Sequence, residues 1–226
     1  MLNLFSGCLA IVFAFMGRLD LVPYCVSVSL IADFFDGFVA RKLSANSPIG
    51  PDLDSLADMV SFGVLPGVIL FLLIDKDMGG KMMLNQEINY LALIGFMVTI
   101  FSAFRLAKFN VDDTQTKDFT GLATPAATIF IVGILILEQR EIVNLQPANY
   151  IIVAALISYL LISKIKMFSF KISGLTWKDS GWQYVFIALS LPILIWLGFA
   201  SLSLIIIIYV FLNLLKYLVE LKQNIA

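Results

Sequence analysis

The chain has 226 residues, of which 60% are apolar and 14% charged, and its formal net charge is −1. Soluble domains are about 45–50% apolar and about 25% charged, so this composition indicates an integral membrane protein without a separate soluble domain. The sequence has no basic cluster that could bind nucleic acid, so we expect no nucleic-acid partner. The chain has no histidine, so acid–base chemistry falls to carboxylates, Lys, Tyr or Cys.

Apolar runs that suit membrane helices recur along the whole chain. A helix needs about 20 residues to cross a bilayer. The loops between the runs are brief, and the last two runs could form a hairpin that turns near Gly198. We therefore predict an all-α integral membrane protein with about eight transmembrane helices. In chain order the predicted helices are 2–17, 21–42, 50–74, 87–109, 121–138, 148–163, 183–198 and 200–219.

The distribution of Lys and Arg predicts the orientation. If the amino terminus lies in the cytoplasm, eleven of the 15 Lys and Arg residues fall on the inner side. This bias agrees with the positive-inside rule and places both termini inside. We find no duplicated half, so an inverted-repeat transporter gains no support.

Acidic residues gather in the second and third predicted helices, at Asp33, Asp36, Asp54 and Asp58. A carboxylate within a membrane helix is costly and marks a functional site by default. Four like charges also repel one another, and divalent metal is the simplest ion to hold them together. Carboxylate oxygens suit Mg²⁺, Ca²⁺ or Mn²⁺. The alternative, a charge network that only fixes helix packing, is disfavoured because uncompensated aspartates stabilise packing poorly.

Helical spacing predicts that these carboxylates face one another. At about 100° per residue, Asp33 and Asp36 share one side of their helix. Asp54, Asp58 and Ser61 share one side of the next helix. Because the connection between the two helices is short, they are expected to be antiparallel neighbours at the cytoplasmic end.

The residues after Asp36 suggest a phosphate ligand. Gly37 and Ala40 leave room beside the carboxylates for a ligand to approach the backbone, and Arg41 offers a planar cation suited to phosphate. Two metals about 3.5–4 Å apart could clamp a displacement at phosphorus. Asp58 could hold one metal and take a proton from an attacking hydroxyl. The rival from another class is a divalent-cation transporter.

The spacing D-x2-D-G-x2-A-R-x8-G-x3-D-x3-D, from Asp33 to Asp58 with Gly50 between, resembles the signature of the CDP-alcohol phosphotransferases. The resemblance implies a six-helix core, Mg²⁺ or Mn²⁺ on the four aspartates with two ions per site, and Asp58 as the base. It also implies CDP packed against Gly37 and Ala40, and commonly a homodimer. Gly50 and Ser61, which lie on the same side of the third helix as Asp54 and Asp58, are expected at the same nucleotide or phosphate site. A hydrogen bond from Ser61 within its own helical turn is the alternative.

Three flanking segments, 58–66, 105–110 and 119–127, resemble small membrane-embedded phosphatidylserine synthases. This resemblance implies transfer of the phosphatidyl group of CDP-diacylglycerol to L-serine, with release of CMP, at the cytoplasmic side of a multi-pass cell membrane protein. It covers about 1–163, the expected core. Residues 164–226 are expected to add a cytoplasmic loop and two more transmembrane helices to the same domain.

The acceptor site is predicted at the inner end of the fourth helix. Arg105 and Lys108, one turn apart, could hold the carboxylate of serine or a lipid phosphate, and Asn110, Thr120 and Thr124 could add hydrogen bonds. Alternatively, Arg105 and Lys108 mark an ordinary positive-inside edge and Thr120 caps a helix. Glycerol 3-phosphate, inositol and inositol phosphate stay open as acceptors.

Overall fold

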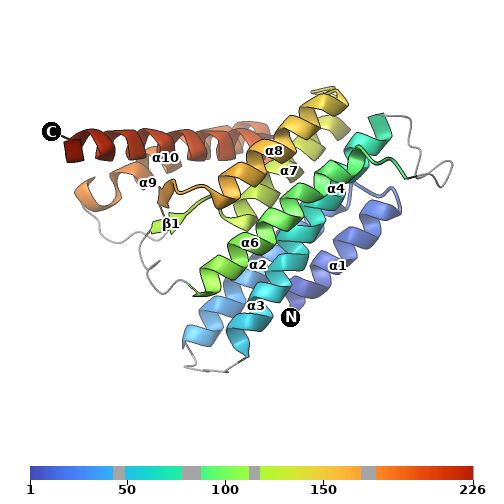
Figure 1. Ribbon diagram of the computed structural model, residues 1–226, viewed down its shortest axis with the longest axis horizontal. Coiled ribbons are helices and arrows are strands. Elements are labelled where there is room, and N and C mark those ends of the chain that lie inside the picture. Colours follow the sequence, from blue (N-terminus) through green and yellow to red (C-terminus); the bar gives the residue numbers. More distant parts are fainter. Residues whose placement is uncertain (43–48, 78–87, 112–117, 169–176, 226) are drawn as a thin grey trace.

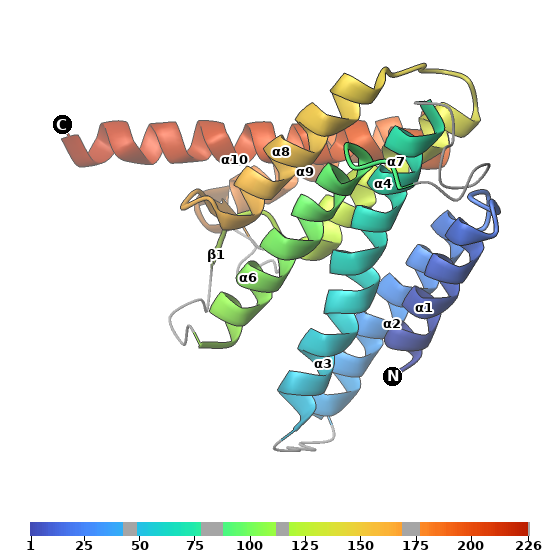
Figure 2. The same cartoon turned by 45° about the vertical axis from the view of Figure 1, so that its right-hand side comes forward.

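The structure is a computed structural model that describes residues 1–42, 49–77, 88–111, 118–168 and 177–225. The helices α1, α4, α6 and α8 run side by side, and α10 crosses this bundle at a clear angle in both views (Figures 1 and 2). The elements are α1 (Leu2–Phe15), α2 (Val22–Lys42), α3 (Gly50–Asp58), η1 (Met59–Val64), α4 (Leu65–Asp77), η2 (Ala92–Phe96), α6 (Met97–Val111), β1 (Asp118–Thr120), α7 (Thr124–Gln139), α8 (Pro147–Ile162), β2 (Lys166–Phe168), α9 (Trp177–Leu197), η3 (Gly198–Ser201) and α10 (Leu202–Ile225).

Helix α4 is the centre of the bundle. Its side chains are buried all round from Val68 to Asp75, and α1, α7 and α8 pack against it. A helix that is apolar on every face is stable only when it is surrounded by other helices or lipid. The core therefore lies between α4, α7 and α8, with Leu65, Ile69 and Ile131 fully buried within it. The central helix thus fixes the position of α3, which continues into it through η1.

The segment η1 is a π-helical turn, and Pro66 explains why regular hydrogen bonding fails there. A proline has no N–H to donate to the carbonyl four residues earlier, which belongs to Phe62. That carbonyl instead accepts a hydrogen bond of 3.0 Å from the Thr128 hydroxyl of α7. The Gly63 carbonyl accepts one of 3.0 Å from the Thr99 hydroxyl of α6. The irregular turn is therefore tied to two neighbouring helices, and such turns are frequent at functional sites.

A small antiparallel β-ribbon was not predicted, since 164–182 was expected to be a loop. Strand β1 pairs with β2 so that Thr120 lies opposite Lys166. Gly121 then turns the chain into α7 with a φ of +77°, a conformation that favours glycine. A Cβ at this position would lie 2.5 Å from the Leu161 carbonyl oxygen. Gly121 therefore lets the ribbon lie against the end of α8.

The last two helices form the predicted hairpin, and they hold the ribbon in place. Helices α9 and α10 pack together, and Gly198, with a φ of +58°, lies at the turn between them. The Asn213 side-chain oxygen accepts a hydrogen bond of 2.7 Å from the Phe168 backbone N–H of β2. The Tyr209 hydroxyl donates one of 2.9 Å to the Phe168 carbonyl. Helix α10 thus anchors β2 through two buried polar contacts.

Each predicted transmembrane segment coincides with a helical segment, but their lengths differ. Within the described residues, three helical stretches are long and apolar enough to cross a membrane: 50–76, 92–111 and 181–219, the last of which includes the α9–α10 hairpin. Helices α1, α7 and α8 have 14, 16 and 16 residues, fewer than the roughly 20 that a bilayer needs. The helical fold is confirmed, whereas the number of eight crossings stays a prediction.

Gly133 allows α10 to approach α7, and its replacement should destabilise the fold. A Cβ at this position would lie 2.5 Å from the Ser203 backbone nitrogen, which cannot move aside without shifting α10. We expect Gly133→Ala to lower the free energy of unfolding by about 1–3 kcal/mol through overpacking. The measurement is the midpoint of thermal unfolding in detergent.

Ser203→Ala is the matched control for this contact. It removes the hydrogen bond of 2.9 Å from the Ser203 hydroxyl to the Phe130 carbonyl but leaves the backbone where it is. Its expected cost is smaller, about 1 kcal/mol. An unfolding midpoint for Gly133→Ala equal to that of the unaltered protein would contradict the close approach of the two helices.

Candidate active site

The acidic side chains of α2 and α3 converge at one end of the bundle. The two helices flank the 43–48 connection and run in opposite directions (Figures 1 and 2). The Asp33 carboxylate is close enough to Asp54 and Asp36 to be repelled by both. Asp58 is repelled in turn by Asp33 and Asp54. The structure therefore brings the predicted acidic residues of both helices into one electrostatic cluster.

The four carboxylates differ in burial. Asp33 and Asp58 are half-buried, whereas Asp36 and Asp54 are exposed. Asp58 lies at the junction of α3 with η1 and accepts a hydrogen bond of 3.0 Å from the Asn3 side-chain nitrogen. Asp36 forms an ion pair of 3.1 Å with the amino-terminal nitrogen of Met1. Asp58 is thus bonded to an uncharged side chain, whereas Asp36 is bonded to a charged amino group.

The donor chemistry of this cluster fits a hard divalent cation. Carboxylate oxygens are the ligands that Mg²⁺ and Mn²⁺ take, and a cation relieves the repulsion among them. Among the residues that the structure describes, no three acidic side chains lie close enough together to form a ready-made metal site. The metal assignment of Asp33, Asp36, Asp54 and Asp58 therefore stays a prediction.

The residues predicted to contact the nucleotide are only partly described. Gly37, Ala40 and Arg41 lie in the last turns of α2, where the side chains fall outside the described part of the chain. Gly50 begins α3 and is half-buried. Ser61 is fully buried in η1, and its hydroxyl donates a hydrogen bond of 2.9 Å to the Asn3 carbonyl. Ser61 therefore contacts α1 in this structure, and its predicted contact with a nucleotide is untested.

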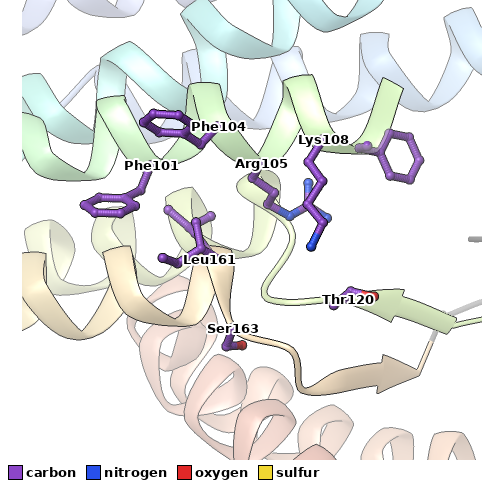
Figure 3. A pocket seen from close by; sticks show the side chains of 9 residues that line it. Phe101, Phe104, Arg105, Lys108, Thr120, Leu161 and Ser163 are labelled. Carbon is purple, nitrogen blue, oxygen red and sulfur yellow. The ribbon is translucent and has the colours of Figure 1, made fainter. Parts of the chain in front are cut away.

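Three of the five predicted acceptor residues line one pocket. Arg105 and Lys108 project from α6 toward Thr120 of β1 (Figure 3). The pocket has a volume of about 400 Å³. Its remaining lining residues are Phe101, Phe104, Phe109, Leu161, Ile162 and Ser163. The pocket therefore combines a cationic end with a largely apolar end between α6 and α8.

Arg105 connects this pocket to the acidic cluster. Its guanidinium group attracts the Asp58 carboxylate. Its Nε atom is buried and has no hydrogen-bond partner among the described residues. A buried donor without a partner is costly, so this nitrogen is suited to an anionic ligand. Arg105 therefore offers a candidate anion site near Asp58, the carboxylate that was predicted to be the base.

The other two predicted acceptor residues lie elsewhere. The Asn110 side-chain oxygen accepts a hydrogen bond of 2.9 Å from the Ser55 hydroxyl of α3. Together with Asp52, these residues line a separate hollow of about 340 Å³. Thr124 is buried at the start of α7, and its carbonyl accepts a hydrogen bond from Thr128. Neither side chain lines the pocket of Arg105, so the structure divides the predicted acceptor set.

Two residues near these sites were missed by the sequence analysis. Asn3 contacts Asp58 and is only 1% exposed. A polar residue inside an apolar predicted helix was the available signal for it. Ser163 lines the pocket of Arg105 because it follows the end of α8, and α8 packs against α6. No spacing in the sequence indicates that arrangement.

Comparison with known proteins identifies relatives along most of the chain. The model of the family described as CDP-alcohol phosphatidyltransferase matches residues 1–196. A CDP-diacylglycerol–serine O-phosphatidyltransferase of Methanocaldococcus jannaschii is 34% identical over 166 residues, which are 74% of this chain and 69% of the relative. The Bacillus subtilis protein of the same name is 30% identical over 75% of this chain and 86% of the relative. The Helicobacter pylori protein is 33% identical over 61% of this chain and 55% of the relative.

These matches agree with the signature in α2 and α3 and with the helical fold. The family match extends past residue 163, the expected end of the core, and includes most of α9. Since the matched region contains the acidic cluster and the pocket of Arg105, the chain belongs to the CDP-alcohol phosphatidyltransferase family of enzymes.

Proposed function

We propose that this enzyme transfers the phosphatidyl group of CDP-diacylglycerol to the hydroxyl of L-serine, giving phosphatidylserine and CMP. The observation that carries the proposal is the convergence of Asp33, Asp54 and Asp58 beside the cationic pocket of Arg105. The names of the relatives support CDP-diacylglycerol and serine as substrates. The Lys and Arg bias supports a cytoplasmic active site in a multi-pass cell membrane protein. A homodimer, implied by the family resemblance, is part of the same proposal.

The reaction divides between two groups of residues. Asp33, Asp36, Asp54 and Asp58 would hold two Mg²⁺ or Mn²⁺ ions, which would supply positive charge to the diphosphate oxygens. Gly37, Ala40, Gly50 and Arg41 are proposed to line the nucleotide site. The half-buried Asp58 takes the proton of the serine hydroxyl, whose oxygen forms a bond to the phosphatidyl phosphorus. The bond from that phosphorus to the CMP oxygen breaks, and CMP leaves with the electron pair.

Arg105 and Lys108 are proposed to hold the serine carboxylate. Figure 3 shows both side chains reaching into the pocket above Thr120. Because Arg105 also attracts Asp58, a carboxylate bound there would place its neighbouring hydroxyl near the base.

Two cations in one pocket also suit a phosphorylated acceptor, so glycerol 3-phosphate and inositol phosphate are the second candidates. Unphosphorylated inositol is the remaining alcohol to be tested as an acceptor. Purified protein with CDP-diacylglycerol and a divalent ion should release CMP with serine and much less with the other alcohols. Equal or greater release with another alcohol would reject serine as the acceptor.

A divalent-cation transporter is disfavoured by the family membership, and it predicts ion flux into liposomes without CMP release.

Asp58→Asn should abolish turnover because the amide cannot accept the proton. General-base catalysis contributes about 10²–10⁴-fold, so we expect a loss of kcat at least that large. The measurement is the incorporation of labelled serine into lipid. Asp52→Asn is the matched control, since Asp52 is exposed on the same helix and lies outside the predicted set. Full activity of Asp58→Asn would show that another group is the base.

Removal of a carboxylate from the cluster should weaken metal binding. Asp33→Asn and Asp54→Asn should each reduce Mn²⁺ affinity about tenfold or more, measured by electron paramagnetic resonance in the presence of CDP. The reason is that each substitution replaces an anionic ligand with a neutral one. Asp52→Asn again serves as the control and should bind Mn²⁺ like the unaltered protein. Equal Mn²⁺ affinity in all variants would contradict the metal assignment.

The pocket cations should determine the KM for serine. Arg105→Gln and Lys108→Gln should each raise this KM about tenfold, because a hydrogen bond to a charged group contributes about 1.5–3 kcal/mol. The KM for CDP-diacylglycerol should change less. Lys166→Gln removes the same charge from an exposed position on β2 that does not line the pocket, and it is the control. A rise in the KM for CDP-diacylglycerol alone would assign these cations to lipid phosphate.

A further inference from the structure

Asn3 joins four segments of the protein at one point. It lies in the first turn of α1 and is 1% exposed. Its side-chain nitrogen donates a hydrogen bond of 3.0 Å to Asp58 Oδ1 at the end of α3. Its backbone carbonyl accepts hydrogen bonds from the Ser29 hydroxyl of α2, at 3.2 Å, and from the Ser61 hydroxyl of η1, at 2.9 Å. The backbone of Asn3 is therefore tied to α2, which carries Asp33 and Asp36, and to η1, which continues α3.

Close packing of α1 keeps this arrangement rigid. Gly7 lies four residues after Asn3, on the same face of α1. A Cβ at position 7 would lie 2.9 Å from the Ser61 Cα, so the absence of a side chain lets α1 contact η1 directly. Asn3 has little freedom to turn away from Asp58, because the Ser29 and Ser61 hydroxyls both hold its backbone carbonyl.

We infer that Asn3 is a positioning residue that fixes the orientation of the Asp58 carboxylate for proton transfer. This inference rests on the proposed function, in which Asp58 is the base. The amide of Asn3 donates a hydrogen bond to Asp58 Oδ1. The other oxygen, Oδ2, is then the one that takes the serine proton. A base that is already oriented loses less freedom when the reaction occurs. Asn3 carries no charge, so it orients the carboxylate without neutralising it.

A purely structural role is the alternative, since buried polar residues often join helices in membrane proteins. Ser6 provides a matched comparison. It is buried on the same helix, and its hydroxyl donates a hydrogen bond of 2.8 Å to the Cys25 carbonyl of α2, away from Asp58. Ser6→Ala therefore removes an interhelical hydrogen bond of α1 without touching the base.

The test compares Asn3→Ala with Ser6→Ala in the full-length protein. For Asn3→Ala we expect kcat to fall about 10–100-fold, as for other residues that orient a functional ligand. The KM for serine should change less than about threefold, since the serine carboxylate is proposed to bind Arg105 and Lys108 and not Asp58. Ser6→Ala should keep its kcat within about twofold while its thermal midpoint falls about as much as that of Asn3→Ala. Asn3→Asp should lose at least as much activity as Asn3→Ala, because it places a second carboxylate against Asp58.

Two outcomes would overturn the inference. One is an unchanged kcat in Asn3→Ala. The other is a parallel loss of kcat and thermal midpoint in Asn3→Ala and Ser6→Ala, which would assign Asn3 to packing alone. If Asn3→Ala folds poorly, Ser29→Ala replaces it in the test. This variant removes one of the two hydrogen bonds to the Asn3 backbone carbonyl, so Asn3 keeps its side-chain amide but is positioned less firmly. We expect its kcat to fall about threefold, and an unchanged kcat would again reject the inference.

Failure of the proposed function appears in a different measurement. If the unaltered protein releases CMP with an acceptor other than serine, the acceptor is wrong, and the Asn3 comparison is made with the acceptor that works. If it releases no CMP with any alcohol, the proposed function fails and the role of Asn3 fails with it. A defect confined to the Asn3 variants supports the inference, since the Ser6 control lies on the same helix and also removes an interhelical hydrogen bond.

Discussion

Mutual repulsion among carboxylates at one end of an apolar bundle is the constraint on which this structure depends. Asp33, Asp54 and Asp58 each oppose the approach of the others, yet α2 and α3 hold them together. The packing that overcomes this repulsion lies elsewhere, in the hydrophobic core around α4. Because α3 continues through η1 into α4, the stable core determines where the unfavourable charges lie. A cation bound among these carboxylates, as proposed, would remove the repulsion.

The second group of contacts brings the pocket of Arg105 to the same end of the molecule. Arg105 attracts Asp58 and also lines the pocket that contains Thr120. Thr120 belongs to a ribbon that α10 holds through Tyr209 and Asn213. The last helix, to which sequence assigned no role, therefore supports the floor of the proposed acceptor site. In this arrangement the acidic cluster that is proposed to bind the phosphate donor and the cationic pocket that is proposed to bind the acceptor meet at Asp58.

The features that were predictable from sequence are periodic or strongly charged. Helical segments follow from long apolar runs, and the acidic cluster follows from the spacing of Asp33, Asp36, Asp54 and Asp58. The β-ribbon was not predictable because its strands have three residues each, too few to show alternation. Asn110 lies apart from Arg105 because it follows five residues later, which turns it about 140° away around the helix toward α3. Asn3 is a single polar residue without any period, and its partners come from α2, α3 and η1, which only the folded structure brings together.

The chemical character of Asn3 explains why a neutral residue suits this position. A lysine or arginine beside Asp58 would form an ion pair, which favours the ionised carboxylate, reduces its basicity and competes with a metal for its oxygens. An apolar residue would leave the half-buried carboxylate unoriented. An amide donates one hydrogen bond, and the carboxylate keeps its charge and its second oxygen. Asn3 orients the carboxylate, while its charge would be balanced by the proposed cation and by Arg105. Orientation and charge balance are thus assigned to different groups.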